Sequence, residues 1–239
     1  MAKDITIVIP AFNEEKNIAS AIESVTAAIA DIVSDYEIIV VNDGSRDRTG
    51  AIADEKARAN PRIKVLHNET NRGYGYTFGR GVGVATKSYI TGFPGDNDAS
   101  STSLEEIVQR IGEADLIFSY MSDTRNRSLL RRFISKFFVI FMNFLFGLRI
   151  KYYNGLILAK RSTLQGIPIK SKGLAAIAEC IVRMVKSGCS YKEIGFQHTG
   201  RQAGKSTAFR LNNIASVLET IMILVKDIYF SSPKTAKST

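Results

Sequence analysis

Five short, largely apolar runs separated by amphipathic stretches constrain the fold of this chain more than any other feature. They lie at residues 5–9, 38–41, 63–66, 89–93 and 116–120. Between them, helices are predicted at 18–30, 49–59 and 76–85 and from residue 103, the first because Ile18, Ile22, Val25 and Ile29 recur at helical spacing. Buried strands that alternate with helices predict an α/β fold with a mainly parallel sheet flanked by helices.

Polar residues directly follow four of these strands. In such a sheet, ligands bind beyond the carboxyl ends of the strands. Helix caps and tight turns account for any one polar cluster, but four clusters on one edge favour a polar ligand. The four segments are 10–15, 42–47, 67–73 and 94–98.

The fourth segment contains Asp96-Asn97-Asp98. Two carboxylates two residues apart in an extended segment point the same way. They can share a hard divalent cation, Mg²⁺ or Mn²⁺, which favours oxygen ligands. The alternative is a surface turn, and the polar ends of the other strands favour the metal site.

Charge is distributed unevenly along the chain. Residues 1–123 hold 12 basic and 19 acidic side chains, whereas residues 124–178 hold 11 basic and no acidic ones. The net charge of +9 therefore reflects a basic middle segment joined to an acidic first half. Because phenylalanines interleave the basic residues, the segment does not resemble a nucleic-acid groove, and no nucleic-acid partner is expected.

Spacing excludes two nucleotide-binding motifs. Residues 200–207 resemble a P-loop but have three residues between the glycines where that loop needs four. The glycines between Gly73 and Gly83 do not spell the dinucleotide-binding pattern. Cys180 and Cys189 are too few for a disulfide framework, which is typical of reduced thiols in a cytosolic protein.

Six phenylalanines between residues 133 and 150 form two adjacent helical stripes. One stripe is ordinary core, but two stripes flanked by arginine and lysine are typical of an amphipathic helix on an anionic membrane surface. We predict this helix at 128–148, within a segment at 125–151 that faces a membrane or an acceptor. The alternative is burial against a membrane partner subunit or a second copy in a homo-oligomer.

A second amphipathic helix is predicted at 208–230, after a domain that spans residues 1–210. It can dock on the domain, on a membrane or on a partner. Residues 231–239 are expected to be a disordered tail. Met1–Asp4 shows no leader, and the apolar stretch at 137–148 is shorter than the ~20 residues that span a bilayer, so we expect a cytoplasmic, peripheral membrane protein.

These motifs resemble one known family. The sequences Ile7-Val8-Ile9-Pro10-Ala11-Phe12-Asn13-Glu14, Val40-Val41-Asn42-Asp43-Gly44-Ser45-Arg46-Asp47 and Asn71-Arg72-Gly73, with the later Asp-x-Asp, resemble the inverting family-2 glycosyltransferases of GT-A fold. Arg131-Arg132 with Ser135, Glu179, and Arg201-x-x-Gly204-x-Ser206 are similar to the polyprenyl-phosphate sugar transferases, such as dolichyl-phosphate mannosyltransferase. The resemblance spans about residues 4–210.

The resemblance implies a role for each matching residue. Asp96 and Asp98 handle the metal, Mg²⁺ or Mn²⁺, and the diphosphate of a UDP- or GDP-linked sugar. Asp43 bonds the base, and Arg131, Arg201 and Lys205 neutralise donor and acceptor phosphates. The implied substrate-binding set is completed by Pro10, Ala11, Asn13, Glu14, Gly73, Asn97, Ser135, Glu179 and Ser206.

The chain departs from the subgroup at three positions. Ser100 stands where the subgroup has a glutamine that helps the metal, which leaves the third ligand open. Asn154 replaces an aspartate before Gly155, and Lys205-Ser206-Thr207 replaces the usual final Ser-Lys. These departures leave the reaction type unchanged but leave the donor open.

The function predicted on this basis is metal-dependent transfer of one hexose to polyprenyl phosphate, with inversion. A lipid phosphate is already anionic and needs no strong base, whereas a hydroxyl of a glycan or glycolipid needs one. Asp98 and then Glu179 are the candidate bases for that alternative. A non-catalytic nucleotide-sugar-binding protein is the second alternative.

Overall fold

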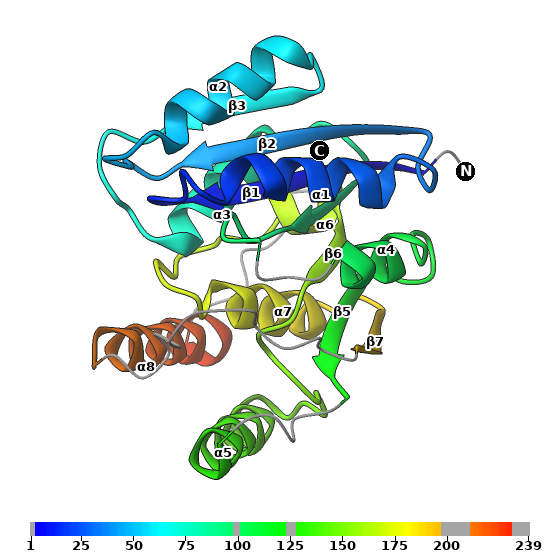
Figure 1. Cartoon of the computed structure of the whole chain (residues 1–239). Coiled ribbons are helices and arrows are strands. Elements are labelled where there is room, and N and C mark those ends of the chain that lie inside the picture. The colour runs from blue at the N-terminus through cyan, green and yellow to red at the C-terminus, as the bar shows by residue number, and fades with distance from the viewer. Residues whose placement is uncertain (1–2, 98–100, 123–127, 197–210, 231–239) are drawn as a thin grey trace, which may run out of the picture.

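The computed structural model describes residues 3–97, 101–122, 128–196 and 211–230, with side chains from residue 215 in the last range. Within these ranges seven strands form one sheet in the order β3-β2-β1-β4-β6-β5-β7 (Figure 1). The strands are β1 (Asp4–Ala11), β2 (Asp35–Asn42), β3 (Ile63–His67), β4 (Tyr89–Gly92), β5 (Leu116–Met121), β6 (Ile157–Lys160) and β7 (Tyr191–Phe196).

The sheet is mainly parallel, which confirms the predicted fold class. Strands β1, β2, β3 and β4 run parallel to one another, and β5 pairs in parallel with β7. Strand β6 is antiparallel to both β4 and β5, a feature that the sequence did not predict. The carboxyl ends of β1 to β4 therefore lie at one edge, where the polar segments follow them.

Helices cover both faces of the sheet, as its two-sided burial requires. The helices are α1 (Ile18–Ile29), α2 (Thr49–Ala59), α3 (Tyr74–Val84), α4 (Ser101–Val108), α5 (Leu129–Phe146), α6 (Arg161–Gln165), α7 (Ala176–Lys186) and α8 (Leu211–Val225). A π-helix, η1 (Lys226–Phe230), continues α8. One face carries α1, α2 and α4, and the other carries α3, α6 and α7 with the packed sides of α5 and α8.

Both amphipathic helices of the sequence analysis are present. Helix α5 begins after Ser128, whose Oγ accepts a hydrogen bond from the backbone N–H of Arg131, and it ends at Gly147 in the left-handed conformation. These are ordinary start and stop signals. Of the helix predicted at 208–230, the described part begins at Leu211, and residues 208–210 lie outside the described ranges. No helix in the described ranges is long and apolar enough to cross a membrane.

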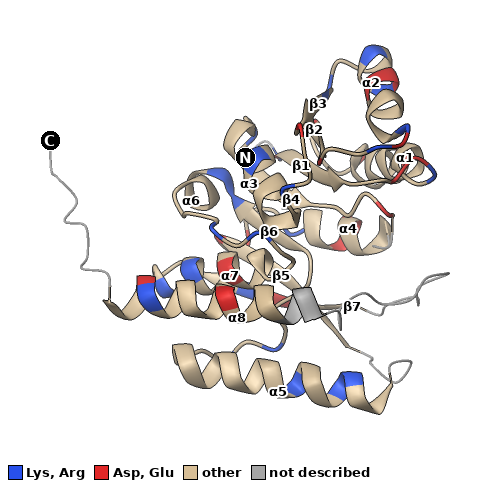
Figure 2. Cartoon of the chain, turned by 90° about the vertical axis from the view of Figure 1, so that its left-hand side faces the viewer, with Lys and Arg blue, Asp and Glu red and all other residues tan. Residues whose placement is uncertain are grey.

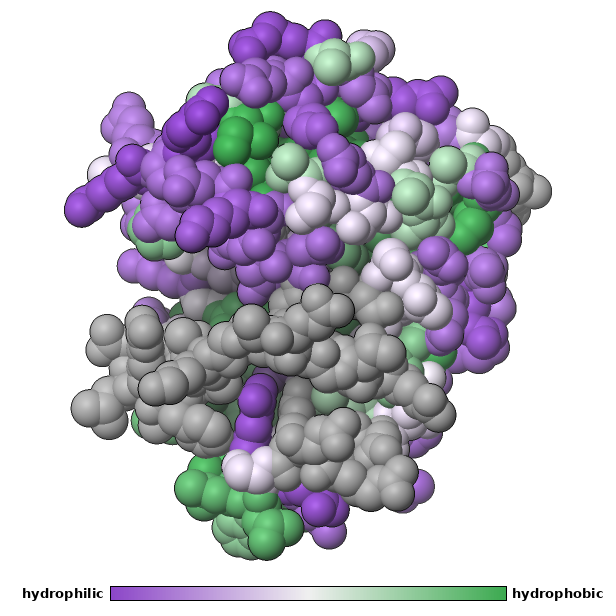
Figure 3. All heavy atoms as spheres, in the orientation of Figure 1, coloured by the Kyte–Doolittle hydropathy of each residue, from purple (hydrophilic) through white to green (hydrophobic). Residues whose placement is uncertain are grey.

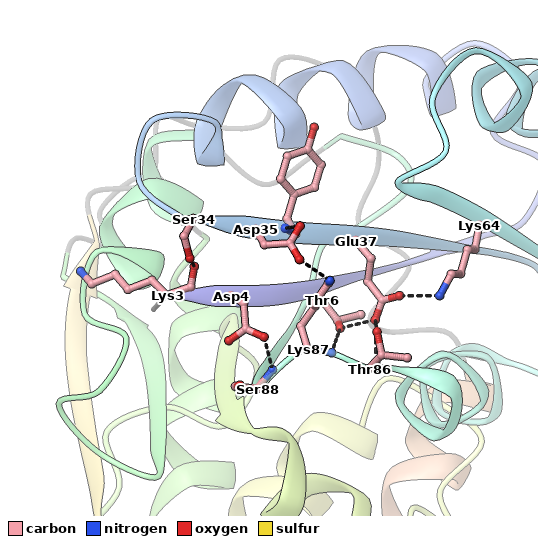
Figure 4. Close-up of polar contacts among 11 residues, drawn as sticks. Lys3, Asp4, Thr6, Ser34, Asp35, Glu37, Lys64, Thr86, Lys87 and Ser88 are labelled. Atoms are coloured by element: carbon pink, nitrogen blue, oxygen red, sulfur yellow. Dashed lines mark hydrogen bonds and ion pairs between the residues drawn. The ribbon is translucent and has the colours of Figure 1, made fainter. Parts of the chain in front are cut away.

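A buried carboxylate ties three strands together away from the polar strand ends (Figure 4). Glu37 in β2 accepts hydrogen bonds from Thr6 Oγ1 (2.8 Å), Lys64 Nζ (2.7 Å) and the backbone N–H of Thr86 (2.6 Å). Burial alone raises the pKa of Glu37, but these hydrogen bonds together lower it to about 2. Glu37 therefore stays ionised and stabilises the β1–β2–β3 part of the sheet.

Candidate functional site

The loop after β1 is fastened to the loop after β2 by reciprocal hydrogen bonds. The backbone N–H of Asn13 donates to Ser45 Oγ (3.0 Å), and Asn13 Oδ1 accepts from the N–H of Arg46 (2.9 Å). Asn13 has a φ of 56°, a left-handed conformation that asparagine tolerates well. The backbone N–H of Glu14 donates to Thr49 Oγ1 (2.7 Å), so the two loops form one surface.

Asp43 joins the loop after β3 to the same surface. Its side chain is buried, and Oδ1 accepts from Asn68 Nδ2 (2.7 Å) and from the N–H of Arg72 (2.9 Å). Oδ2 accepts from the N–H of Gly73 (2.9 Å). The residue expected to bond a base therefore organises the loop at 68–73.

The turn after β4 packs closely on the end of β1. A side chain at Gly95 would lie 2.8 Å from the carbonyl oxygen of Pro10, so the two backbones meet directly. Pro10 lies beyond the last β1 residue paired with β4, Val8, so its missing N–H costs no ladder bond on that side. Ala11, expected to line the pocket, is buried beneath this contact.

Asp96 follows in this turn, and its charge acts on Glu14 from the first loop. Burial, together with the charges of Asp96 and Asp47, raises the pKa of Glu14, against a hydrogen bond from Asn17 that lowers it. Asn97 also has a φ of 56°, and its Nδ2 donates to Ser24 Oγ (3.4 Å). Segments that are far apart in the sequence thus bring Glu14, Asp47 and Asp96 to one place.

The carboxylates at this edge repel one another. A hard divalent cation, which prefers oxygen ligands, would offset that repulsion. In the described ranges, no group of three or more His, Cys, Asp or Glu side chains is placed so that it could hold a metal ion. Asp98 and Ser100 lie outside those ranges. Of the residues predicted to form the metal site, Asp96 is the one that the structure describes.

Of the three residues predicted to neutralise phosphates, Arg131 is the one that lies in the described part of the chain. Arg131 and Ser135 lie on α5, which is far from α2 and β3 in Figure 1. Arg201, Lys205 and Ser206 lie outside the described ranges. The structure therefore brings together Asn13, Glu14, Asp43, Gly73 and Asp96, and the roles assigned to these and to the other site residues stay predictions.

Glu179, predicted to bind substrate, is fully buried in the first turn of α7. Its Oε2 accepts from the backbone N–H of Ser171 (2.8 Å), and its Oε1 accepts from Arg183 Nε (2.8 Å). The carboxylate thus holds the segment before α7. Burial and full hydrogen bonding are typical of a supporting residue, and they offer no exposed oxygen for a general base.

Several residues that were not among the predicted site residues close the loops on one another. Ser45, Asp47 and Thr49 bond the first loop, and Asn68 and Arg72 bond Asp43. A signal was present in Asp47-Arg48-Thr49, since an aspartate just before a helix commonly caps it. Asp47 Oδ1 does accept from the N–H of Thr49 (3.0 Å). The partners in other loops carry no comparable local signal.

Comparisons with known proteins agree with this architecture. The model of Glycosyl transferase family 2 matches residues 6–178. Glucosyl-3-phosphoglycerate synthase from Mycobacterium tuberculosis, solved with Mn²⁺, UDP-glucose and phosphoglyceric acid, superposes with a TM-score of 0.70 at 18% identity, over 97% of this chain and 82% of that one. At that identity the likeness establishes the fold alone, which is GT-A.

Two curated relatives illustrate the sequence matches. The uncharacterised glycosyltransferase EpsJ of Bacillus subtilis is 33% identical over 47% of this chain, and the match covers 31% of its own length. Polyprenol monophosphomannose synthase of Mycolicibacterium smegmatis is 28% identical over 84% of this chain and 79% of the relative. This chain therefore spans about a third of the first relative and most of the second.

Proposed function

The chain belongs to glycosyl transferase family 2, and we propose that it transfers a hexose from a UDP- or GDP-linked sugar to polyprenyl phosphate with inversion. The observation that carries this proposal is the closure of four strand-end loops around Glu14, Asp43, Gly73 and Asp96. This edge is where α/β sheets bind nucleotides. The relatives support the reaction class, and the mannose synthase supports the acceptor class.

The proposed donor site divides into a base end and a diphosphate end. Asn13 and Asp43 sit at the ends of β1 and β2, and Asp43 fixes the loop that contacts the base. The diphosphate end is assigned to Asp96 and Asp98, which would hold a divalent cation that supplies positive charge there. A glucosyl-3-phosphoglycerate synthase of the same fold has been solved with Mn²⁺ and UDP-glucose, which supports this arrangement.

Charge explains how such a site accelerates transfer. Breaking the bond between the anomeric carbon and the diphosphate builds negative charge on the leaving oxygen. Carboxylates at the site repel this developing negative charge. Positive charge is therefore needed, and we propose that Arg131, Arg201 and Lys205 supply it. A phosphate acceptor attacks as an anion from the opposite face of the sugar and inverts the anomeric centre. No general base is then required.

Helix α5 supports a lipid acceptor. Its outward face carries only apolar side chains: Leu129, Leu130, Phe133, Ile134, Phe137, Ile140, Phe141 and Phe144, all exposed. Arg132 and Lys136 flank that face, and the apolar patch lies at the bottom of Figure 3, over α5. We propose that this face rests on an anionic membrane, where apolar residues insert and basic ones meet headgroups.

A second copy of the chain is a less favourable occupant of that face. In a parallel pair of α5 helices, Arg132 and Lys136 would lie near the same residues of the partner copy, and in an antiparallel pair they would lie near the second half of that helix, which has no acidic residue. No acidic residue between 124 and 178 is present to compensate them. Anionic lipid supplies the missing charge.

The test is a panel of UDP- and GDP-sugars offered with a short polyprenyl phosphate. We expect a lipid-linked sugar from one donor, with Mg²⁺ or Mn²⁺, and loss of product with a chelator. Activity that survives chelation contradicts the metal assignment. Product on a soluble glycan alone, with none on lipid phosphate, replaces the lipid acceptor by a hydroxyl acceptor.

Membrane contact is tested separately by sedimentation with vesicles. Wild-type protein is expected to bind vesicles that contain anionic lipid and to leave them at high salt. Phe137→Ser with Phe144→Ser is expected to abolish binding, and the matched pair Leu218→Ser with Met222→Ser, on exposed positions of α8, is the control. Equal loss in both double variants contradicts the assignment to α5.

A further inference from the structure

A continuous series of hydrogen bonds links the C-terminal η1 to the loops of the donor site. At its far end, Asp227 Oδ2 accepts from Arg183 Nη2 (2.7 Å) of α7 and from Lys170 Nζ. The Asp227 side chain is 15% exposed and that of Arg183 is 9% exposed. An ion pair this far from solvent is screened less than a surface pair and holds its geometry more firmly. Figure 2 marks the positions of the charged residues along α7 and along the helix labelled α8.

Arg183 also pairs with Glu179, which lies one turn earlier on α7. Its Nε donates to Glu179 Oε1 (2.8 Å), while Glu179 also accepts from the backbone N–H groups of Lys170 (3.1 Å) and Ser171 (2.8 Å). Two carboxylates, Glu179 and Asp227, thus balance two cations, Arg183 and Lys170. The position of the backbone at 170–171 depends on this balance.

That backbone lies directly against the start of α3. The N–H of Gly75 donates to the carbonyl of Lys172 (2.8 Å), and a side chain at Gly75 would lie 1.8 Å from the carbonyl oxygen of Ser171. At Gly73, with a φ of 88°, a side chain would lie 2.5 Å from the carbonyl oxygen of Lys172. The two backbones touch with no side chain between them, so neither moves without the other.

Gly73 completes the path, because its N–H and that of Arg72 are the groups that Asp43 binds. We infer that Asp227 is a positioning residue for the donor site, acting through Arg183 and Glu179 on the segment 170–172 and so on the loop at 68–73. The inference rests on the proposed function, in which that loop contacts the nucleotide. In this inference η1, which continues α8, contributes to donor binding as well as to packing against the core.

The test replaces Asp227 by asparagine, which keeps the size and removes the charge. Hydrogen exchange of the Gly73 and Gly75 amides is measured alongside the dissociation constant for UDP and GDP. Exchange at both amides and the dissociation constant are each expected to rise about threefold to tenfold, the range of coupling through packed networks. KM for the donor is expected to rise with kcat almost unchanged, because the reacting groups are untouched.

The matched control is Asp115→Asn. Asp115 also pairs with a lysine, Lys160 (2.7 Å), and bonds Ser190 at the opposite side of the sheet, but it has no link to this series. It is expected to leave exchange at both glycines and nucleotide binding unchanged. If Asp227→Asn does not fold, Lys170→Gln removes one of the two cations, and its half-exposed side chain makes the substitution milder.

The outcomes separate the inference from the proposed function. Unchanged exchange at Gly73 and Gly75 in Asp227→Asn overturns the inference, whatever the protein binds. Faster exchange with an unchanged dissociation constant also overturns it, because the loop then moves without affecting the donor. Wild-type protein that binds neither nucleotide contradicts the proposed function, and the exchange measurement still decides whether Asp227 positions the loop.

Discussion

The part of the sheet from β1 to β4 and the part from α5 onward use their side chains in opposite ways. At the ends of β1 to β3, polar groups are bonded to neighbouring loops, as Asn13, Asp43 and Asp47 show. On α5, large apolar side chains point away from the protein, with Phe144 87% exposed. The loops of the first part are held by contacts with one another, whereas the second part presents an apolar surface that the described residues leave exposed.

This difference determines which substitutions each part can accept without loss of function or stability. A polar network in a partly buried site loses function when one acceptor is removed, because the remaining donors stay unpaired. An exposed apolar face loses nothing in stability when a side chain is shortened, since it was never buried. Substitutions in the two parts should therefore separate activity, stability and surface binding.

The largest expected effect is on catalysis at the end of β4. Asp96→Asn removes a carboxylate proposed to hold the metal at the diphosphate, and transfer is expected to fall about 100-fold or more. The measurement is the initial rate of product formation at saturating donor. Asp54→Asn, on the exposed side of α2, is the control and is expected to retain the wild-type rate. Comparable losses in both variants would show that charge in general, not this site, matters.

The next effect contrasts two phenylalanines of one helix. Phe146 is fully buried against Tyr229, whereas Phe144 is exposed. Phe146→Ala is expected to lower the free energy of unfolding by about 3–5 kcal/mol, and Phe144→Ala by less than about 0.5 kcal/mol. Urea denaturation of both variants measures the difference. A large loss from Phe144→Ala would mean that a partner covers the outward face of α5 in solution.

The same contrast explains how far the sequence could predict the molecule. Apolar runs and helical spacing predicted the first five strands and their intervening helices, because burial on both faces of a parallel sheet leaves a clear local pattern. The antiparallel β6 was missed, since Ile157–Lys160 is short and its partners, β4 and β5, are set by long-range packing. The two phenylalanine stripes located α5 almost to its ends, since the predicted helix at 128–148 is Leu129–Phe146 in the structure.

The candidate site was predictable in its residue types and not in its contacts. Asp43 and Asp96 stood out because polar residues follow buried strands. The bonds of Asp43 to Arg72 and Gly73 join segments about 30 residues apart, and no local pattern encodes them. Glu179 was assigned to substrate by resemblance, but the structure surrounds its carboxylate with backbone donors and Arg183. Only the packed chain distinguishes such a supporting carboxylate from an exposed one.

A smaller effect probes stability at the amino-terminal half of the sheet. The pKa of Glu37 is about 2 in the folded protein, below its ordinary value of 4.5, so its contribution is present above about pH 4.5 and is lost as the pH falls towards 2. That contribution is at most about 3 kcal/mol. Unfolding of wild type and Glu37→Gln is expected to differ most near pH 7 and to converge below pH 3. Glu23→Gln, which removes a carboxylate from an exposed pair with Lys56, is the control variant.

The smallest expected effect tests whether the loops at the site need both oxygens of Asp43. Asparagine keeps one acceptor but presents an NH₂ group where the second oxygen accepted an N–H from Arg72 or Gly73, so one backbone donor is left unpaired. The free energy of unfolding is expected to fall by about 1–3 kcal/mol, with weaker nucleotide binding. Urea denaturation and titration with UDP and GDP measure the two losses in one preparation. If Asp43→Asn keeps full stability but binds no nucleotide, the carboxylate contacts the ligand and is not needed to hold the loop. The hydrogen-bonded closure of the loops at this edge of the sheet would then depend on the bound nucleotide sugar.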